Sequence, residues 1–501
     1  MKRTYPKILR NRKTRIARRL KPCCWPEQPQ PMMSGSNIHY AMADRAQAVS
    51  CGGIGAIHLM AQRIGLVGQI NDQVRVLKRH LPYHESDHVL TVAYNIIAGG
   101  VRIEDLELRR TDEAFMNGLG AQRLPDPTTA GDFTRRFQQG DTVALMEAIN
   151  AARQRVWQEQ PEHFMEEAVI DVDGTIAGTL GQCKQGMSMS YKGIWGYAPL
   201  ITSLANTKEV LYLVNRPGNV ASHQGSAEWI DRSIDLVKPR AKSVFVRGDT
   251  DFALTKHFAR WTDAGVKFLF GMDASPCLVA QAQALHQAHW RGLARVGRQI
   301  QTGPRERPDN VKEQIVREKG YLNKVLQSEQ VAEFEYQPGA CERTYRVVVL
   351  RKNISVERGE DFLFPEIKYF FYITNRKDLT IEEVVQQANQ RCNQENVIAQ
   401  LKNGVNAMRM PVDNLLSNWA YMVMAALAWN LKAWFGLLMP DAERGRQIVR
   451  MEFRSFLAAI IQVPAQIVRT ARRILYRVMG YNGWLKDFLA TWERLRRMEA
   501  S

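Results

Sequence analysis

The chain has 501 residues, of which 45% are hydrophobic and 24% charged, so it is long enough and apolar enough to fold into several structural units. Lys and Arg outnumber Asp and Glu by 68 to 51, and this net charge of +17 favours a polyanionic partner, nucleic acid before an anionic membrane surface. Seven scattered cysteines without a C-x-x-C pair argue against a disulfide framework and a zinc site, and indicate a reducing compartment.

Residues 1–38 are predicted to form a basic mobile arm. The first twenty residues, "MKRTYPKILRNRKTRIARRL", hold nine Lys or Arg and no acid, and "PEQPQPMMSGSN" follows them closely. A segment rich in Pro, Gln and Ser buries too little apolar surface to fold by itself. No apolar run of signal-peptide length follows the basic residues, so we expect a protein that is not secreted.

Residues 39–160 are predicted to form a helical N-terminal domain. Breaks marked by glycine separate its helical segments, and Asp126 or Thr128 can cap a helix with phenylalanines on one side and arginines on the other. Basic helical faces are typical of DNA-contacting modules, so we expect this domain to bind DNA. A plain helical packing domain is the alternative interpretation of the same pattern.

Residues 161–272 change to a mixed α/β pattern. Three strand-type runs come first, "AVIDVDGT", "GYAPLITSLA" and "EVLYLVN". The helical segment "SAEWIDRSIDLVK", the strand "SVFVRG", the helical segment "ALTKHFARWTDAG" and the strand "VKFLFGM" follow. This order predicts a mixed sheet that begins with a meander.

Residues 273–375 are predicted to be a β-rich insertion, because "VAEFEY", "TYRVVVL" and "KYFFYITN" follow a polar, Arg-rich stretch. Helical text resumes in residues 376–440, which include the apolar run "LLSNWAYMVMAALAWNLKAWFGLL". Two asparagines and a lysine interrupt this run, so we expect a buried helix of a soluble core and no membrane span.

Residues 441–501 are predicted to form a basic helical C-terminal region. In "IVRTARRILYRV" an arginine recurs every four residues, at Arg469, Arg473 and Arg477. On a helix these side chains form one stripe. The stripe could follow a DNA backbone, and a solvated helix face is an equal alternative.

Three acidic residues occupy positions at which a metal-binding or catalytic site is expected. Asp173 and Asp249 end two strand-type runs, and ligands bind at the carboxyl ends of strands in open α/β sheets. Glu395 lies four residues after Arg391 and seven before Lys402, so the three share one face of a helix. Carboxylates suit Mg²⁺ or Mn²⁺. The alternatives are a cap or turn for each Asp and a surface ion pair for Glu395.

The motifs "DVDGT", "RGDTDF" and "RCNQENVIAQLK", in this order around a β-rich insertion, resemble those of the DDE transposases of bacterial insertion sequences. One group of these families ends in Y-x2-R-x3-E-x6-K, and this chain matches the R, E and K. "YKGIWGYAPL" and "LPDPTTAGDF" are most similar to the IS thirteen-eighty branch. The resemblance implies a ribonuclease-H-like α/β core with a β-rich insertion, between the helical N-terminal domain and the helical C-terminal region.

The resemblance also implies roles for the motif residues. Asp173, Asp249 and Glu395 would be the catalytic carboxylates that hold two Mg²⁺ or Mn²⁺ ions, while Arg391 and Lys402 would bind DNA phosphates.

The chain departs from the family pattern at two points. Ala388 stands where the family motif has Tyr, and each Asp motif contains a second acid. Asp171 shares a strand face with Asp173 and stays open as a candidate. Asp251 is expected to cap the helix that follows.

The implied function is transposition. A homodimer would bind the terminal inverted repeats of its own element and catalyse cut-and-paste excision and strand transfer into target DNA. We expect it in the bacterial cytoplasm, nucleoid-associated when bound, with no membrane partner and no nucleotide cofactor. Two alternatives stay open, a metal-dependent DNA nuclease on the same core and a non-catalytic DNA-binding relic or repressor.

Overall fold

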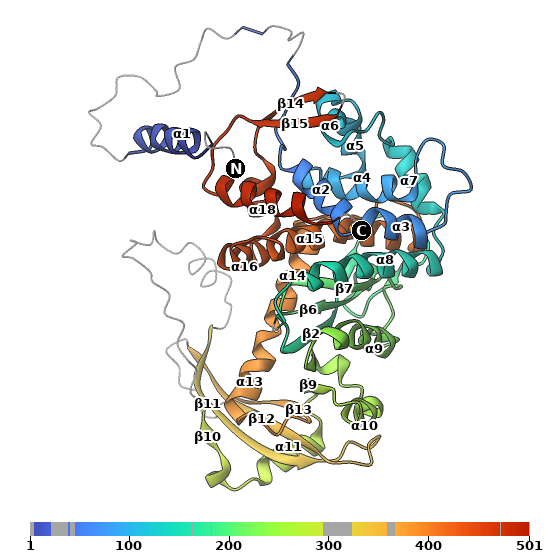
Figure 1. Cartoon of the computed structure of the whole chain (residues 1–501). Helices are drawn as coiled ribbons and strands as arrows, with labels where there is room; N and C mark the ends of the chain where they lie inside the picture. The colour runs from blue at the N-terminus through green and yellow to red at the C-terminus, as the bar shows by residue number, and fades with distance from the viewer. Residues whose placement is uncertain are drawn as a thin grey trace. The chain divides into compact units, whose positions relative to one another are not determined.

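The computed structural model describes residues 5–21, 39–40, 46–162, 164–181, 183–293, 323–357, 366–470 and 472–499 (Figure 1). The chain divides into two compact units. The first unit comprises Met1–Phe164, Gly174–Val220 and Asn396–Ser501, and the second comprises Met165–Asp173 and Ala221–Glu395. These limits differ from those of the predicted domains, because helices from the N-terminal and C-terminal parts of the chain pack against one another in the first unit.

The basic arm contains a helix where a mobile segment was expected. Helix α1 (Tyr5–Arg19) buries no residue, and Arg12 donates to the carbonyl oxygens of Val478 at 3.2 Å and Gly480 at 2.8 Å. Its lysines, arginines and leucine are good helix formers, which explains the helix. The stretch "PEQPQPMMSGSN" lies outside the described residues.

The first unit is mainly helical, as expected for residues 39–160. Asp126 is the residue that caps α7, since its side chain accepts from the backbone N–H of Thr129 at 2.8 Å. Phe133 and Phe137 are buried, as the apolar side of that segment required. Besides α1, the α-helices described in this unit are α2 (Ile54–Arg63), α3 (Leu66–Gln73), α4 (Glu85–Ile97), α5 (Leu106–Arg110), α6 (Glu113–Leu119), α7 (Pro127–Arg135), α8 (Gln139–Gln158), α15 (Leu415–Leu437), α16 (Ala442–Arg450), α17 (Phe453–Phe456) and α18 (Leu485–Arg497).

Helix α15 is the centre of the first unit, and it packs against α4, α8 and α16 (Figure 1). The two asparagines and the lysine that interrupt its apolar run have internal partners. Asn430 bonds both backbone groups of Val210, and Lys432 donates to the carbonyl oxygen of Val449 at 2.9 Å. The interrupted apolar run is therefore a buried helix, as predicted. No helix among the described residues is long and apolar enough to cross a membrane.

Three small groups of strands belong to the first unit. The antiparallel pair β6 (Leu200–Leu204) and β7 (Glu209–Val214) contains the second and third of the three strands predicted as a meander. The second group has the order β3 (Ala177–Gly178), β5 (Trp195–Tyr197), β4 (Ser188–Met189). The third has the order β1 (Ala48–Val49), β14 (Ala465–Thr470), β15 (Arg473–Val478).

The third group corrects the prediction of a C-terminal helix over "IVRTARRILYRV". Strands β14 and β15 form an antiparallel hairpin in which Arg469 lies opposite Ile474 and Arg477 opposite Gln466. Since side chains alternate along a strand, Arg473 and Arg477 share one face while Arg469 is on the other. The predicted single stripe of arginines is therefore wrong. The buried Ile467 fixes which face of the hairpin is covered.

The second unit is built on a mixed sheet with the strand order β10, β11, β12, β13, β9, β8, β2. Strands β2, β8 and β9 are parallel, and a crossover through α10 joins β8 to β9. The strands are β2 (Glu167–Gly174), β8 (Ser243–Gly248), β9 (Lys267–Met272), β10 (Arg291–Gly292), β11 (Asn323–Tyr336), β12 (Tyr345–Glu357) and β13 (Glu366–Thr374), and the helices are α9 (Ser226–Val237), α10 (Phe258–Asp263), α11 (Pro276–Ala284) and α13 (Ile381–Gln390). Helix α14 (Cys392–Asn403) crosses the limit between the units.

The predicted β-rich insertion continues this sheet. Strand β13 pairs antiparallel with β9, with Phe371 opposite Met272 and Thr374 opposite Leu269. The long β11–β12 hairpin then extends the sheet beyond β13. Residues 294–322 and 358–365 of the insertion lie outside the described residues. The fold class is mixed α/β with separate helical regions, as expected.

Candidate active site

The ends of two neighbouring parallel strands place two carboxylates at the same edge of the second unit's sheet. Asp171 of β2 lies opposite Arg247 of β8 in the parallel register. Asp173 follows two residues later on β2, and Asp249 follows Gly248, the last residue of β8. Both run into their turns from buried strands rich in Val and Ile, which fixes where each strand ends. The strand register therefore brings these two side chains to one site.

Asp249 shapes its own turn. Its side chain accepts from the backbone N–H of Asp251 at 3.1 Å and caps the short 3₁₀ turn Thr250–Phe252. Asp251 itself is exposed and caps no helix in the structure, so the role predicted for it belongs to Asp249. Burial raises the pKa of Asp249, and the nearby guanidinium of Arg391 opposes that rise.

Arg391 lies between the two carboxylates. Its Nη1 atom is 3.3 Å from Oδ2 of Asp173 and 3.9 Å from Oδ2 of Asp249. The side chains of Asp173, Asp249 and Arg391 are 14%, 35% and 23% exposed, so solvent reaches the group. A positive group bridging two carboxylates shows that this edge of the sheet favours a cation.

Asp171 has a different environment from Asp173. Its two oxygens accept from Nε and Nη2 of Arg247 at 2.7 and 3.0 Å, and both side chains are almost fully buried. Arg247 also donates to the backbone and side-chain oxygens of Gln387 on α13. Asp171 is thus part of a buried ion pair that ties β2 and β8 to α13. Sequence reasoning missed Arg247 and Gln387, although Arg247 stands two residues before Asp249 in "VRGD".

Helix α13 positions Arg391 at its C-terminal end. Thr380 caps its N-terminus, accepting from the backbone N–H of Glu383 at 3.2 Å while the Glu383 carboxylate accepts from Thr380 N–H. Val384 and Val385 are buried in a core cluster with strand residues, and Ala388 packs against the same cluster. The position at which the family motif has Tyr is therefore a packing position in this chain.

Arg391 lies at a junction between two helices. The predicted continuous helix is divided there into α13 and α14, with Arg391 as the C-terminal cap of α13. Glu395 is exposed in the first turn of α14. Lys402 is in the last turn and belongs to the first unit, where its Nζ donates to the carbonyl oxygen of Ile176 at 3.0 Å. A common face for the three remains a prediction.

The three predicted carboxylates are not gathered around a single point. Among the described residues, the set of three His, Cys, Asp or Glu side chains whose ligand atoms lie within reach of one ion is His80, His84 and Glu85. The structure thus brings Asp173 and Asp249 to Arg391, and it leaves Glu395 outside that contact. Carboxylate oxygens at a partly exposed sheet edge still fit a hard divalent cation by their chemistry.

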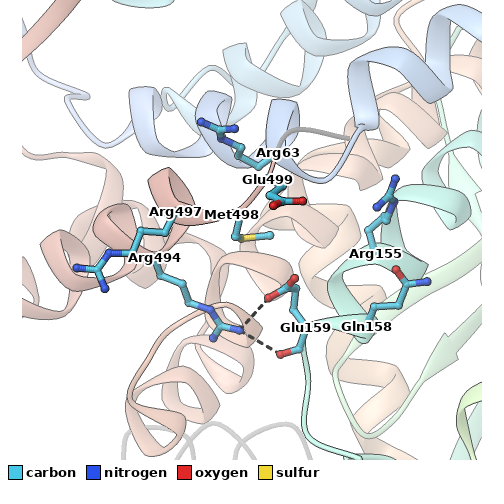
Figure 2. Close-up of a pocket in the computed structure, with 8 residues that line it drawn as sticks. All are labelled: Arg63, Arg155, Gln158, Glu159, Arg494, Arg497, Met498 and Glu499. Atoms are coloured by element: carbon cyan, nitrogen blue, oxygen red, sulfur yellow. Dashed lines mark hydrogen bonds and ion pairs between the residues drawn. The ribbon is translucent and has the colours of Figure 1, made fainter.

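A cavity of about 490 Å³ in the first unit contains none of the predicted site residues (Figure 2). Arg494 donates to the carbonyl oxygens of Leu438 and Glu159, which follow the last residues of α15 and α8. Helices α2 and α18 end at the cavity too, and helix C-termini attract cations. Its arginines are thus explained by helix ends. The lining residues are Arg63, Arg155, Gln158, Glu159, Arg494, Arg497, Met498 and Glu499.

Comparison with known proteins gives a family for the chain. The sequence profile of the family described as "Transposase DDE domain group 1" matches residues 31–500. The cryo-EM structure of the piggyBac transposase synaptic complex with hairpin DNA is similar over 82% of this chain and 81% of that chain, with 11% identical residues and a TM-score of 0.34. No curated protein matches the sequence.

Proposed function

The chain belongs to the family of Transposase DDE domain group 1, and we propose that it catalyses cut-and-paste transposition of an insertion sequence. As a DDE transposase it acts in DNA transposition and DNA recombination. The finer assignment is the IS thirteen-eighty branch, with a ribonuclease-H-like core. In this proposal a homodimer in the bacterial cytoplasm holds two element ends, and residues 39–160 contribute to end binding.

The observation that carries the proposal is the contact of Asp173 and Asp249 with Arg391. Two carboxylates leave adjacent parallel strands at one edge and share a guanidinium at 3.3 and 3.9 Å. Phosphoryl transfer uses carboxylates that hold divalent cations and a positive side chain that binds the scissile phosphate. A purely structural ion pair needs no solvent access, whereas these side chains are partly exposed.

The cofactor proposed is Mg²⁺ or Mn²⁺, as two ions. Asp173, Asp249 and Glu395 would hold them, since carboxylates are the oxygen ligands these ions prefer. When bound, the ions supply charge stabilisation for the attacking and leaving oxygens of an in-line displacement. Glu395 must approach the strand ends for this, from its place in the first turn of α14, four residues after Arg391.

Arg391 and Lys402 are proposed as the phosphate-binding residues. Arg391 bridges the two aspartates in the structure, and in the complex its planar guanidinium would be released to a DNA phosphate. Lys402 would contribute a point charge. In the reaction proposed, water attacks the phosphodiester at the element end, the freed 3′-hydroxyl attacks the opposite strand, and strand transfer to target DNA follows a second hydrolysis.

The test is a cleavage assay on a labelled DNA fragment that carries the element's end. The purified full-length chain is incubated with Mg²⁺ or with EDTA, and cleavage and joining to a second DNA are followed on gels. We expect end-specific cleavage that needs the ion and yields joined product. Asp173→Asn, Asp249→Asn and Glu395→Gln should each abolish cleavage and leave binding of the DNA end largely intact.

Asp251→Asn is the matched control, because Asp251 is exposed and the substitution keeps the backbone N–H that it donates to Asp249. It should cleave normally. Cleavage that persists in Glu395→Gln would remove Glu395 from the site. Ion-dependent cleavage without end specificity would favour the nuclease alternative. Tight binding with no cleavage under any condition would favour the non-catalytic DNA-binding protein.

A further inference from the structure

A second group of ligand-type side chains lies at the start of α4 in the first unit, outside the candidate active site. His80 belongs to the loop after α3, His84 is the N-cap of α4, and Glu85 is the first residue of that helix. One nitrogen of each imidazole and one carboxylate oxygen all lie within 4.8 Å of one another. We propose that His80, His84 and Glu85 bind a transition-metal ion of the zinc class.

The buried carboxylate of Glu85 is the first reason. Glu85 is only 2% exposed. Its Oε1 accepts from the backbone N–H of Leu77 at 3.1 Å, and its Oε2 lies 3.0 Å from Nε2 of His80. A buried carboxylate must be hydrogen-bonded or paired with a positive group. A metal ion bound by Oε2 of Glu85 and by Nε2 of His80 would supply that group.

The two histidines can supply the nitrogen ligands. The rings of His80 and His84 lie 4.2 Å apart between centroids with an interplanar angle of 21°. Metal binding requires both imidazoles to be neutral, so that each offers a nitrogen lone pair. One ion would compensate the charge of Glu85 and bind one nitrogen of each ring, after a rotation of the stacked side chains that makes their lone pairs converge.

Hydrogen bonds hold the first turn of α4, which carries His84 and Glu85, in place. The backbone N–H of His84 donates to the carboxylate of Asp87 at 2.8 Å, and the N–H of Ser86 donates to the side chain of Asn71 on α3 at 2.9 Å. The first turn of α4 is therefore tied to α3. Ordered ligands of this kind lose little conformational entropy when an ion binds.

Some of the nearby charges favour a bound cation and others disfavour it. The N-terminus of α4 and the loop residues Lys78 and Arg79 disfavour a cation, while Glu85 and Asp87 in the first turn favour it. Affinity must therefore come from coordination bonds. Imidazole nitrogen binds zinc, cobalt, nickel and copper well and Mg²⁺ poorly, and three protein ligands leave a fourth position for water. The site differs in this respect from the all-carboxylate candidate site.

Metal binding would cross-link the loop of residues 74–84 to helix α4. The ion would fix His80 to the first turn of α4, and the backbone of Leu77 is already held there by Glu85. The site is independent of the proposed transposition reaction. Its test needs no DNA.

The experiment titrates Co²⁺ and Zn²⁺ into the tag-free full-length chain that carries Asp173→Asn and Asp249→Asn, so that the candidate active site takes up no ion. Visible absorption reports Co²⁺ bound to nitrogen ligands, and calorimetry gives the stoichiometry with Zn²⁺. We expect one ion per chain, unaffected by a large excess of Mg²⁺, and a higher Tm with Zn²⁺. Absence of saturable binding, or displacement by Mg²⁺, would overturn the proposal.

The variants His80→Ala and His84→Asn locate the site. Asn is a favourable N-cap residue, so His84→Asn removes a ligand and preserves the start of α4. Each change should weaken binding by more than about tenfold and abolish the Zn²⁺-dependent rise in Tm. His223→Ala, an exposed histidine of the second unit, is the control and should bind as the parent does. Unchanged Co²⁺ spectra in both His80→Ala and His84→Asn would place the ion elsewhere and refute the proposal.

Discussion

At the residue scale, the two aspartates of "DVD" have different environments. Asp171 is 1% exposed in a bidentate ion pair with Arg247, whereas Asp173 is partly exposed and 3.3 Å from Arg391. The sequence left both open, because side chains two apart on a strand share a face. The difference arises because Asp171 pairs with the buried Arg247 and Asp173 with the partly exposed Arg391.

Because of this difference, substitution of Asp171 should destabilise the fold much more than substitution of Asp173. Asp171→Asn leaves the buried guanidinium of Arg247 without its counter-charge and should lower the free energy of unfolding by about 3–5 kcal/mol. Asp173→Asn should change it by less than about 1 kcal/mol, since its partner is solvent-accessible. Urea unfolding followed by circular dichroism measures both. Equal stability of the two variants would contradict the assignment of Asp171 to the framework.

Lys432 predicts a pH dependence of stability. Burial lowers its pKa to about 7, and the charge of Lys208 adds to the effect. Between that value and the ordinary lysine pKa, the unfolded chain binds a proton that the folded chain does not, so stability rises with pH across this window. Each pH unit within the window contributes about 1.4 kcal/mol at most.

The measurement compares the parent with Lys432→Met by urea unfolding at pH 7 and pH 9. The variant lacks the titrating group, so its unfolding free energy should rise by about 1–2 kcal/mol less than that of the parent over this interval. Lys486→Met removes an exposed lysine and serves as the control. A parent and a Lys432→Met variant with parallel pH profiles would show that Lys432 does not titrate in this range.

At the element scale, α13 carries Arg391 to the strand ends, and its start depends on a short local signal. The Thr380–Glu383 capping box is readable in "TIEE", and the buried Val384 and Val385 follow it at helical spacing. Thr380→Ala should cost about 1 kcal/mol of unfolding free energy, because one helix-end N–H loses its acceptor. Thermal unfolding measures this, with the exposed Gln386→Ala as control. No loss in Thr380→Ala beyond that of the control would show that the cap is unimportant.

The β14–β15 hairpin shows where element prediction failed. Arginines at every fourth position indicated a helix, but the same letters contain Ile, Val, Leu and Tyr, which suit a strand. Contacts with residues far away in the sequence favour the strand over the helix. A Cβ atom at Gly55 or Gly118 would lie within 3 Å of the Tyr476 ring or its hydroxyl, so these glycines leave room for the tyrosine against α2 and α6. Such contacts between residues hundreds of positions apart are invisible to local periodicity.

At the scale of the whole molecule, a buried ion pair joins α8, β7 and α15 of the first unit. Arg153 and Glu209 are fully buried, with Nε 2.9 Å from Oε1. The indole N–H groups of Trp157 and Trp434 donate to the same carboxylate at 3.0 and 2.7 Å. Three segments far apart in the sequence therefore share one charge network.

Removal of one partner should destabilise this unit strongly. Arg153→Met leaves Glu209 buried and negative, so the free energy of unfolding should fall by about 3–5 kcal/mol. The double variant Arg153→Met/Glu209→Gln removes both charges and keeps an acceptor for the indoles, so it should recover part of the loss. Urea unfolding of the parent, the single variant and the double variant measures this coupling. A double variant less stable than Arg153→Met would contradict the explanation.

The sequence by itself determined the features that depend on local chemistry. Strand and helix order in residues 161–272, the buried apolar helix and the acids at the ends of β2 and β8 followed from periodicity and residue type. The family match over residues 31–500 agrees with the transposase motifs. Only the tertiary structure decided that Asp171 belongs to Arg247, that Arg391 lies between Asp173 and Asp249, and that the C-terminal arginines lie on a hairpin. Each of these depends on strand register or on packing between distant segments, which no local pattern of residues encodes.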